Sequence, residues 1–331
     1  MPFPFRSDSL LTTTHLWFTV QATTPLALDE YSGAALRGSF FNAIWQRFCT
    51  NKSAPSCAAC PLNGTCPVSA LVAPLREESP GGQDIPRPYV MIPPLEGAKH
   101  YQPGECLAFG LTLIGSIVQL LPYIMLSIPQ LETGGLGLRL DENKGQRGRF
   151  QVKRVECYHP FTEQRQTIYQ EGDMRVDVPV ITTQPQEHLA RAAQLNKEQI
   201  TLHFVTPLRL VYHRHLIQRA TFSPFVQRLL ERYLALECYH GRRELTLSRE
   251  DKIAWLQQAD KIQCSSDQTH WQELKSYSNR QRRTTPISGL IGTATFVGDL
   301  QPFLELLVLG ELIHVGKDAV KGNGRYKIVL S

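Results

Sequence analysis

Residues 324–328 read Gly-Arg-Tyr-Lys-Ile, and residues 148–152 read Gly-Arg-Phe-Gln-Val. The two segments lie 176 residues apart, counted from Gly148 to Gly324. Each one follows a stretch rich in glycine and basic residues, and each opens a short alternating strand. Matching segments at long range indicate that the chain holds two copies of one structural unit.

Two further pairs of segments recur in the same order. Thr24-Pro25-Leu26 matches Thr206-Pro207-Leu208, with an offset of 182 residues from Pro25 to Pro207. An alternating strand that ends at Gly115 and the apolar segment after it match the stretch around Gly298, with an offset of 183 residues. Offsets this similar are typical of a duplicated domain, with the differences confined to loops.

The pattern of each half predicts the fold. In the first half it predicts strands over 16–22, 89–92, 107–114 and 150–155 and helices ending near Phe48 and over 118–131. The order βαββαβ, present twice, predicts an α+β protein of two tandem ferredoxin-like domains, whose sheets are common platforms for RNA. We place the domains at residues 1–195 and 196–331, since the length allows two domains of ordinary size.

Residues 314–325 form a glycine-rich basic loop, which follows an apolar helical segment and precedes the last strand. Glycine lets the backbone adopt positive φ and approach another backbone closely, and lysine and arginine supply charge for a phosphate. The alternative is a tight turn with solvated lysines. The repeated architecture favours a loop that binds a phosphodiester backbone.

Composition is compatible with an RNA-binding protein that has two hydrophobic cores. Hydrophobic residues make up 42% of the chain, and the formal net charge is +5. Residues 106–131 carry no charge, but glycines and prolines interrupt them, so we expect a buried strand and a buried helix and no membrane span. The first residues lack the apolar core of a leader, and we expect a cytoplasmic protein.

Four cysteines, Cys49, Cys57, Cys60 and Cys66, form the pattern Cys-x7-Cys-x2-Cys-x5-Cys. Four thiolates can close a tetrahedral metal site, and we expect an insertion over about 49–72 that holds a structural zinc ion. An iron–sulfur cluster is a second possibility, because Pro follows Cys60 and Cys66 as at ferredoxin-type ligands. Disulfides are the remaining alternative and are disfavoured in a reducing compartment.

Several motifs in order give the chain a family resemblance. The motifs are Leu36-Arg37-Gly38, the four-cysteine insertion, Pro86-Arg-Pro-Tyr-Val90, Thr206-Pro-Leu-Arg209, Tyr277-Ser-Asn-Arg-Gln281, and Leu309 to Tyr326 with its glycine-rich loop. Over nearly its whole length the chain resembles the CRISPR-associated precursor-crRNA-processing endoribonucleases of the RAMP superfamily. The resemblance implies binding of a repeat RNA hairpin and a single cut at the hairpin base without a catalytic metal. The implied products carry a 5′-hydroxyl and a 2′,3′-cyclic phosphate.

The chemistry needs few protein groups, because the ribose 2′-OH is the nucleophile. The protein aligns this hydroxyl, removes its proton, protonates the leaving 5′-oxygen and stabilises the phosphorane. Many relatives carry a general-base histidine on or after the first helix, whereas this chain has no His between His15 and His100. The candidate catalytic residues are His314, Lys317 and Tyr31, with His213 and His215 as a second choice. A structural role is the alternative for each of them.

Basic residues in three runs, together with Arg37 of the first helix, are the candidate RNA contacts; a solvated surface is the alternative for the runs. We assign RNA binding to Arg280, Arg282, Arg283, Lys321, Arg325, Arg147, Arg149 and Arg37.

Three functions fit the sequence. The first is a metal-independent endoribonuclease that cuts CRISPR repeat transcripts into crRNA. The second is a non-catalytic subunit that holds the crRNA hairpin in a CRISPR effector complex, with other effector subunits as its partners. The third is a zinc-containing RNA-binding protein unrelated to CRISPR.

Overall fold

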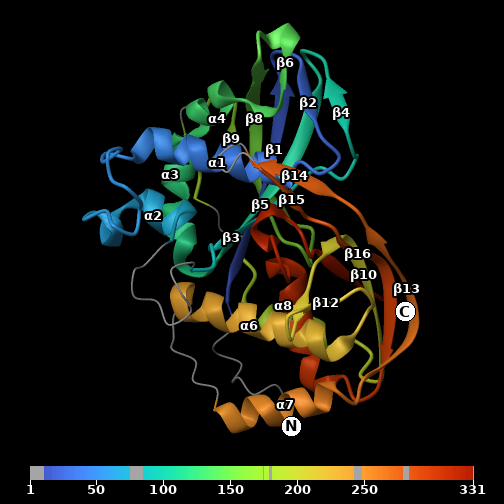
Figure 1. The fold of residues 1–331 in the computed structure, drawn as a ribbon. Helices are drawn as coiled ribbons and strands as arrows, with labels where there is room; N and C mark the ends of the chain where they lie inside the picture. Colours follow the sequence, from blue (N-terminus) through green and yellow to red (C-terminus); the bar gives the residue numbers. More distant parts are fainter. Residues whose placement is uncertain are drawn as a thin grey trace. The chain divides into compact units, whose positions relative to one another are not determined.

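The computed structural model describes residues 11–74, 85–173, 175–178, 181–241, 248–278 and 283–330. The chain divides into two compact units. The N-terminal unit is Thr13–Thr182, and the C-terminal unit is Thr183–Ser331 together with Met1–Thr12. Figure 1 shows the elements of both units along the chain.

The N-terminal unit is a five-stranded antiparallel sheet in the order β3-β5-β1-β8-β9. Its strands are β1 (Thr13–Ala22), β3 (Tyr89–Ile92), β5 (Cys106–Ile114), β8 (Phe150–Tyr158) and β9 (Arg165–Gln170), and its main helices are α1 (Gly33–Phe48), α3 (Leu121–Leu126) and α4 (Ile128–Gly134). Strands β1, β3, β5 and β8 with helices α1, α3 and α4 form the βαββαβ order of a ferredoxin-like domain, and β9 extends the sheet at one edge.

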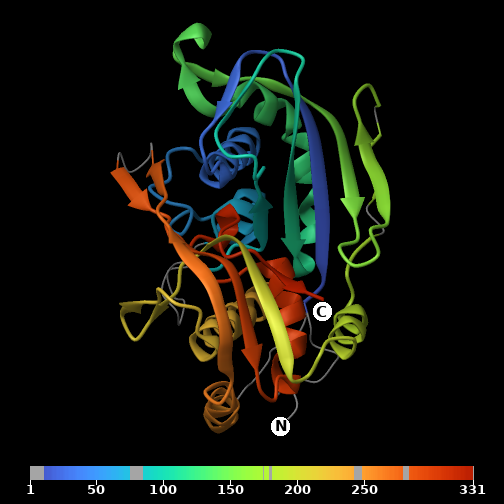
Figure 2. The same cartoon turned by 90° about the vertical axis from the view of Figure 1, so that its right-hand side faces the viewer.

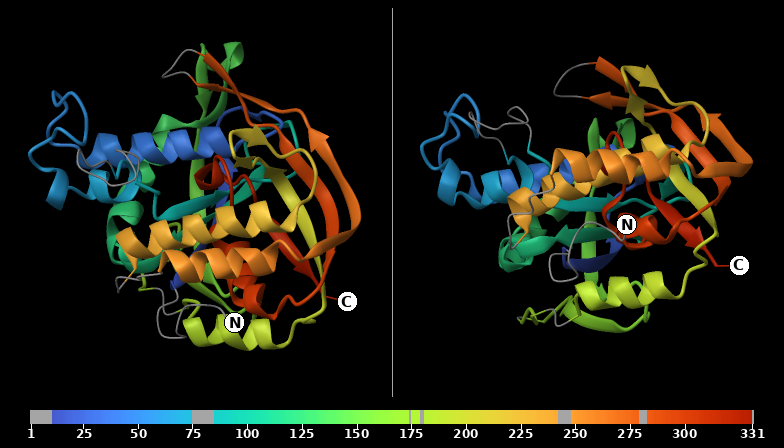
Figure 3. Two further views of the ribbon diagram at one scale, coloured as in Figure 1. Left: turned by 60° about the horizontal axis from the view of Figure 1, so that its bottom comes forward. Right: turned by 90° about the horizontal axis from the view of Figure 1, so that it is seen from below.

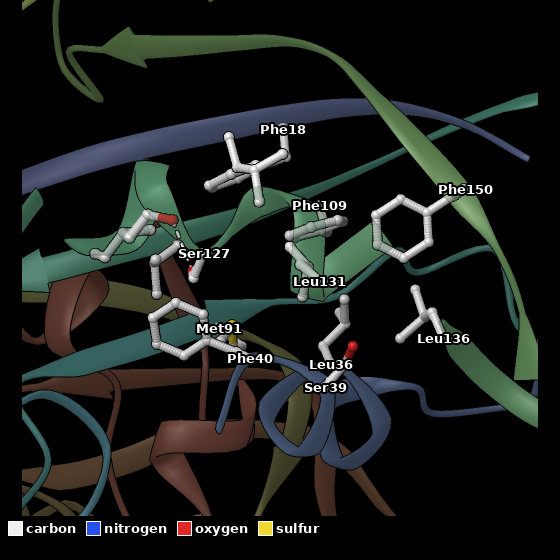
Figure 4. Close-up of a pocket in the computed structure, with 13 residues that line it drawn as sticks. Phe18, Leu36, Ser39, Phe40, Met91, Phe109, Ser127, Leu131, Leu136 and Phe150 are labelled. Atoms are coloured by element: carbon white, nitrogen blue, oxygen red, sulfur yellow. Dashed lines mark hydrogen bonds between the residues drawn. The ribbon is translucent and has the colours of Figure 1, made fainter. Parts of the chain in front are cut away.

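The core of the N-terminal unit lies between the sheet and these helices, which cover the same face (Figures 1 and 2). Phe18, Phe109 and Phe150 project from β1, β5 and β8 toward Phe40 of α1 and Leu131 of α4 (Figure 4). Phe18 and Phe109 are stacked with ring centroids 5.0 Å apart. Burial of these aromatic side chains is the main stabilising term for the unit.

Shorter elements decorate this unit. They are β2 (Leu26–Leu28), α2 (Pro67–Val72), β4 (Lys99–Tyr101), β6 (Leu136–Leu140) and β7 (Gln146–Gly148); β2 pairs with β4, and β6 with β7. The uncharged run 106–131 is a strand followed by helices, as expected, but the expected single helix over 118–131 is two short helices. Pro122 and Pro129 each occupy the first turn of one of them, where a missing N–H costs least. Among the described helices, none combines the length and apolarity needed to cross a bilayer.

The C-terminal unit repeats the arrangement with a four-stranded antiparallel sheet in the order β13-β16-β10-β17. Its elements are α5 (Pro185–Ala193), β10 (Gln199–Leu208), α6 (Phe222–His240), α7 (Arg249–Ala259), β13 (Gln263–Gln272), β16 (Gly289–Val297), α8 (Leu304–Ile313) and β17 (Tyr326–Val329). Two hairpins, β11–β12 (Val211–Tyr212, His215–Leu216) and β14–β15 (Lys275–Ser278, Arg283–Pro286), are added to this order. The predicted fold, two tandem ferredoxin-like domains, is confirmed.

Aromatic residues fill the core of the C-terminal unit. Phe204 of β10, Phe225 of α6 and Tyr326 of β17 contact one another in edge-to-face pairs. The Tyr326 hydroxyl donates to the carbonyl oxygen of Leu307 on α8 at 2.6 Å. Helices α6 and α7 run side by side (Figure 3). Through Tyr326, the last strand β17 thus contacts both α6 and α8.

The division between the units falls at Thr182, earlier than the boundary that we placed at residue 195. Helix α5 therefore belongs to the C-terminal unit, where it packs against α8. Its residues His188 and Ala192 are buried. The partner of α5 lies more than a hundred residues away in the sequence, so local pattern carries no sign of this packing.

Candidate nucleic-acid interface

The glycine-rich loop, residues 314–325, begins where α8 ends. The backbone N–H of His314 donates to the carbonyl of Gly310, and that of Val315 donates to the carbonyl of Gly324 at 3.2 Å, which closes the loop at its base. Gly324 has φ +64°, and a Cβ there would lie 1.7 Å from the Val315 carbonyl oxygen. Only glycine allows this approach of two backbones.

The loop rests on the end of β10, in the motif Thr206-Pro207-Leu208-Arg209. The Thr206 hydroxyl donates to the carbonyl of Gly322 at 2.8 Å and accepts from the N–H of Arg325 at 2.9 Å. The carbonyl of Pro207 accepts from the Gly324 N–H, and that of Arg209 from the Lys317 N–H, both at 3.0 Å. These bonds satisfy the backbone of an irregular segment and fix its shape.

The N-terminal unit contains the same contact. The Thr24 hydroxyl accepts from the backbone N–H of Arg149 at 2.8 Å, and the Thr23 N–H donates to the Arg149 carbonyl. A Cβ on Gly148 would lie 2.5 Å from Cα of Leu26. In each unit, therefore, the Thr-Pro-Leu segment and the Gly-Arg segment contact each other through the same hydrogen bond.

Among the cations of the glycine-rich loop, Lys317 stands apart. Its side chain is exposed, and it makes no ion pair in the part of the chain that the structure describes. Lys321 pairs with Asp318 at 2.7 Å. Arg325 is half-buried and lies near Glu311. Burial raises the pKa of Glu311, and the charge of Arg325 offsets part of this rise. Lys317 therefore offers the loop's available charge for a phosphate.

His314 occupies an unusual position. Its backbone has φ 59° and ψ 173°, a region that is almost reserved for glycine, and its side chain belongs to a residue that is 1% exposed. Beside it, Nε of Arg232 donates to the carbonyl of Ile313 at 2.9 Å, at the C-terminal end of α8. Burial lowers the pKa of Arg232 to about 10. The predicted catalytic imidazole is therefore buried where α8 passes into the loop.

Tyr31 and Arg37, both predicted from the first helix, also lie against protein. Tyr31 is 8% exposed and sits just before Ser32, the N-cap of α1. The Arg37 guanidinium lies 5.7 Å from the Phe41 ring centroid. It also lies near Tyr89, where burial raises the pKa of the phenol and the charge of Arg37 offsets part of that rise. Both residues have a visible packing role.

The β6–β7 hairpin carries three arginines. Arg147 lies directly opposite Arg139 in the strand register, and Arg149 is exposed just beyond β7. Burial lowers the pKa of Arg147, and the neighbouring charge of Arg139 lowers it further. None of these three arginines makes an ion pair within the described residues. Like charges opposite each other are unfavourable without an anion, so the hairpin is suited to a phosphate. Sequence reasoning missed Arg139, because only strand pairing places it beside Arg147.

The third predicted basic run lies on the β14–β15 hairpin. Arg280 and Arg282 lie outside the described residues, and Arg283 opens β15, with its backbone paired to Ser278. His213 and His215 are exposed at the β11–β12 turn, whose two central residues, His213 and Arg214, have φ 46° and 66°. Within the described part of the chain, no backbone hydrogen bond joins His213 or His215 to the glycine-rich loop.

The four cysteines lie in the segment between α1 and α2. Cys49 is the C-cap of α1, Cys66 is the N-cap of α2, and all four thiols are half-buried and free of disulfides. No residue from 49 to 66 is buried. Within the described ranges, no group of three or more His, Cys, Asp or Glu side chains is gathered closely enough to hold a metal ion. Four cysteine thiols are suitable ligands for zinc. In the described ranges they are not gathered into a metal site, so the zinc ion stays a prediction.

Comparison with known families gives two matches that together span most of the chain. Residues 11–181 match the model of the AF_1859_N family, described as an N-terminal domain. Residues 202–326, which include the Thr206 motif and the glycine-rich loop, match the model of the CRISPR-associated endoribonuclease Cas6. A search of curated proteins found no match to this chain.

Solved structures share the fold over the full length. A Cas6 product complex aligns with a TM-score of 0.57 and 13% sequence identity, over 96% of this chain and 99% of the other. Cas6 of Thermus thermophilus gives a TM-score of 0.53 at 14% identity, over 97% and 100%. A partial Cas6-RT-Cas1–Cas2 complex gives 0.59 at 14% identity, covering all of this chain and 47% of the other.

Proposed function

We propose that this chain, whose residues 202–326 match the Cas6 endoribonuclease model, cuts CRISPR repeat transcripts once, at the base of the repeat hairpin, to release crRNA. The observation that carries the proposal is the glycine-rich loop, which is hydrogen-bonded to Thr206-Pro-Leu-Arg209 and exposes Lys317. A backbone cradle with one available cation suits a single phosphate held for chemistry.

The proposed reaction is attack of the ribose 2′-OH on the adjacent phosphorus. The 2′-OH releases its proton to water as the 2′-oxygen–phosphorus bond forms and the bond to the 5′-oxygen breaks, leaving a 2′,3′-cyclic phosphate and a 5′-hydroxyl. The substrate supplies the nucleophile, so we propose that no catalytic metal takes part. We propose that Lys317 binds the phosphate, stabilises the phosphorane and donates a proton to the departing oxygen, which solvent then restores.

The two other predicted catalytic residues have weaker geometric support. His314 is 1% exposed and Tyr31 is 8% exposed, so neither side chain presents itself to an RNA phosphate. We propose His314 as a positioning residue that fixes the start of the glycine-rich loop. Proton transfer by His314 or Tyr31 remains the competing prediction, and cleavage by their variants separates the two roles.

For RNA binding we propose the arginines of the β6–β7 hairpin, Arg139, Arg147 and Arg149, together with Lys321 and Arg325 of the loop. Arg280, Arg282 and Arg283 on the β14–β15 hairpin remain proposed contacts from the sequence. Arg37 is a weaker member, because its guanidinium already packs on Phe41. The RNA partner is CRISPR repeat RNA and the crRNA made from it, and we expect these encounters in the cytoplasm.

A structural zinc ion on Cys49, Cys57, Cys60 and Cys66 is also proposed. The segment that holds these thiols has no buried residue of its own, so hydrophobic packing does not explain its order. Thiolate–metal bonds stabilise segments of this kind. An iron–sulfur cluster on the same thiols is the alternative, and neither group would take part in the cut.

A second function has one observation in its favour, the burial of His314 together with the absence of a histidine on α1. It is a non-catalytic subunit that holds the crRNA hairpin and contacts other CRISPR effector subunits. Such a protein needs the same loop and the same arginines but no acid or base.

Incubation of the purified chain with a repeat transcript from its source, in excess chelator, tests the proposal. We expect one specific cut, with a cyclic phosphate on the 5′ product. Replacing the 2′-OH beside the cut phosphate with hydrogen should abolish the product and leave binding intact. A cut that needs magnesium contradicts the metal-independent mechanism, and tight binding without any cut establishes the second function.

A further inference from the structure

An aromatic side chain lies at the base of the β14–β15 hairpin. Trp271 is the penultimate residue of β13, the edge strand of the C-terminal sheet. No residue of β13 is buried, and Trp271 is a half-exposed indole in a strand of mostly polar residues. Part of the Trp271 surface is therefore open to solvent, where a flat ligand can reach it.

The indole is held in a fixed orientation. Its Nε1–H donates to one carboxylate oxygen of Glu273 at 2.7 Å, and the other oxygen accepts from the Ser288 hydroxyl, also at 2.7 Å. The bonds from Ser288 and Trp271 lower the pKa of Glu273, so this carboxylate stays charged as the acceptor. A ring fixed before binding loses little conformational freedom when a ligand arrives.

Arg209 adds a second planar group. Its guanidinium carbon lies 5.9 Å from the centre of the Trp271 ring, and Nη1 donates to the Ser288 carbonyl at 3.2 Å. The guanidinium and the indole are therefore fixed by the same short segment at the base of the hairpin.

The same arginine joins this pair to the glycine-rich loop. The Arg209 carbonyl accepts from the Lys317 N–H at 3.0 Å, and a Cβ on Gly316 would lie 2.7 Å from that carbonyl oxygen. Asn323 of the loop also donates to the Ile287 carbonyl, next to Ser288, at 3.3 Å. The backbone of Arg209, whose guanidinium lies on Trp271, is thus hydrogen-bonded directly to the backbone of Lys317.

We propose that Trp271 and Arg209 form a stacking shelf for one unpaired nucleobase of the bound RNA, beside the phosphate held at Lys317. The shelf rests on the proposed function for its phosphate neighbour, but stacking requires only single-stranded RNA. Every base has a flat π face that stacks on an indole or a guanidinium, so the shelf selects for an unpaired nucleotide more than for a base identity. The negative charge of Glu273 disfavours a phosphate at the indole edge and directs the backbone toward Lys317.

The test is binding to a single-stranded adenosine oligoribonucleotide of about 12 nucleotides, measured by fluorescence anisotropy. Trp271→Ala should weaken binding about 10-fold, while Trp271→Phe keeps most of the affinity. Trp45→Ala is the matched control, since Trp45 is another half-exposed tryptophan, with the Lys52 ammonium 5.3 Å from its ring. An equal loss in Trp45→Ala, or no loss in Trp271→Ala, would overturn the shelf.

A photo-crosslink to the wild-type chain tests the shelf without any substitution, in case Trp271→Ala does not fold. The oligoribonucleotide with one 5-iodouridine, irradiated on the wild-type chain, should crosslink to Trp271, and a crosslink confined to other residues overturns the proposal. The repeat transcript separates the two claims. If the oligoribonucleotide stacks on Trp271 but the repeat transcript is not cut, the proposed function alone is rejected. If the repeat transcript is cut and neither RNA needs Trp271 for binding, the shelf alone is rejected.

Discussion

Thr206 holds Arg325 by a hydrogen bond from the Arg325 backbone N–H to the threonine hydroxyl, 2.9 Å long. Thr24 holds Arg149 in the same way at 2.8 Å in the other unit. Thr206 lies near the end of β10 and Thr24 lies two residues beyond the end of β1, and each bond reaches the residue just before the last core strand of its domain. In the C-terminal unit this bond also fixes the end of the loop that carries Lys317.

Replacing Thr206 with valine should damage both stability and cleavage. The hydroxyl is in a residue that is 1% exposed, and its loss leaves the Arg325 N–H and the Gly322 carbonyl without their partner. We expect a loss of about 1–3 kcal/mol in unfolding free energy and slower cleavage. Thr24→Val is the matched control, in which stability falls and the cleavage rate at saturating enzyme stays closer to that of the wild type. Equal cleavage by Thr206→Val and wild type would show that the loop does not depend on this bond.

Lys317→Ala should reduce the single-turnover cleavage rate by about 10²-fold, because the cation acts on charge that develops in the transition state. Repeat affinity should also fall, with a salt dependence shallower by about one phosphate contact. Lys321→Ala is the control, since Asp318 already pairs with that ammonium, and it should lose much less activity. A wild-type cleavage rate in Lys317→Ala would remove Lys317 from the mechanism.

His314 is tested by a pair of substitutions that differ in the backbone. Glycine tolerates φ 59° and ψ 173°, whereas alanine keeps strain of about 1–3 kcal/mol. If His314 positions the loop, His314→Gly should melt at a higher temperature than His314→Ala, and both should cleave within about 10-fold of wild type. A loss of about 10²-fold or more in both variants, with the glycine variant folded, would instead identify the imidazole as the acid or base.

The sequence was sufficient to predict the fold because its signals are local. Alternating strands that end at Gly115 and Gly298 and the two Gly-Arg segments recur in register, and the order of elements then specifies the domain. Two features differ from the prediction. Helix α5 packs on α8 across the predicted boundary, a contact between distant residues that no local pattern reports. The expected helix over 118–131 is divided into α3 and α4 by a local signal, the prolines that start each helix.

The candidate site was readable only in part. The Thr206 motif and the glycine-rich loop were found as separate segments, and their hydrogen bonds explain why both are present. The burial of His314 follows from tertiary packing that no local pattern reports. Trp271 carried a usable signal, a tryptophan in an otherwise polar strand, but its pairing with Arg209 joins residues far apart in the sequence.

Metal analysis of protein purified without oxygen should find about one zinc ion per chain. The expectation rests on four half-buried cysteines that form no disulfide, in a segment with no buried residue. Cys57→Ser combined with Cys60→Ser should lose the metal and increase hydrogen exchange in residues 49–66, while the chemical step changes little. Cys106→Ser with Cys264→Ser is the control, because both thiols are exposed and isolated. Protein without metal would reject the site, and substantial iron would favour the cluster.

Stability should fall as the pH rises from about 5 to 8, through a buried carboxyl group. Glu237 is 3% exposed near the C-terminal end of α6, and burial raises its pKa from 4.5 to about 7. Between these two values the folded chain holds a proton that the unfolded chain has released, so each increase in pH favours unfolding. Helix C-termini also disfavour negative charge. Burial gives Glu311 a pKa of about 7 as well, so both groups act in the same direction.

Glu237→Gln should therefore flatten the decline in melting temperature over this range and should melt higher than wild type at pH 8, where the wild-type carboxylate is charged. Glu250→Gln, a change at an exposed carboxylate on α7, is the control and should keep the wild-type pH profile. The measurement is thermal unfolding followed by circular dichroism in buffers from pH 5 to pH 8 at constant ionic strength. Parallel profiles for Glu237→Gln and wild type would mean that Glu237 has an ordinary pKa in the folded chain, because only a group that titrates differently in the two states changes the slope.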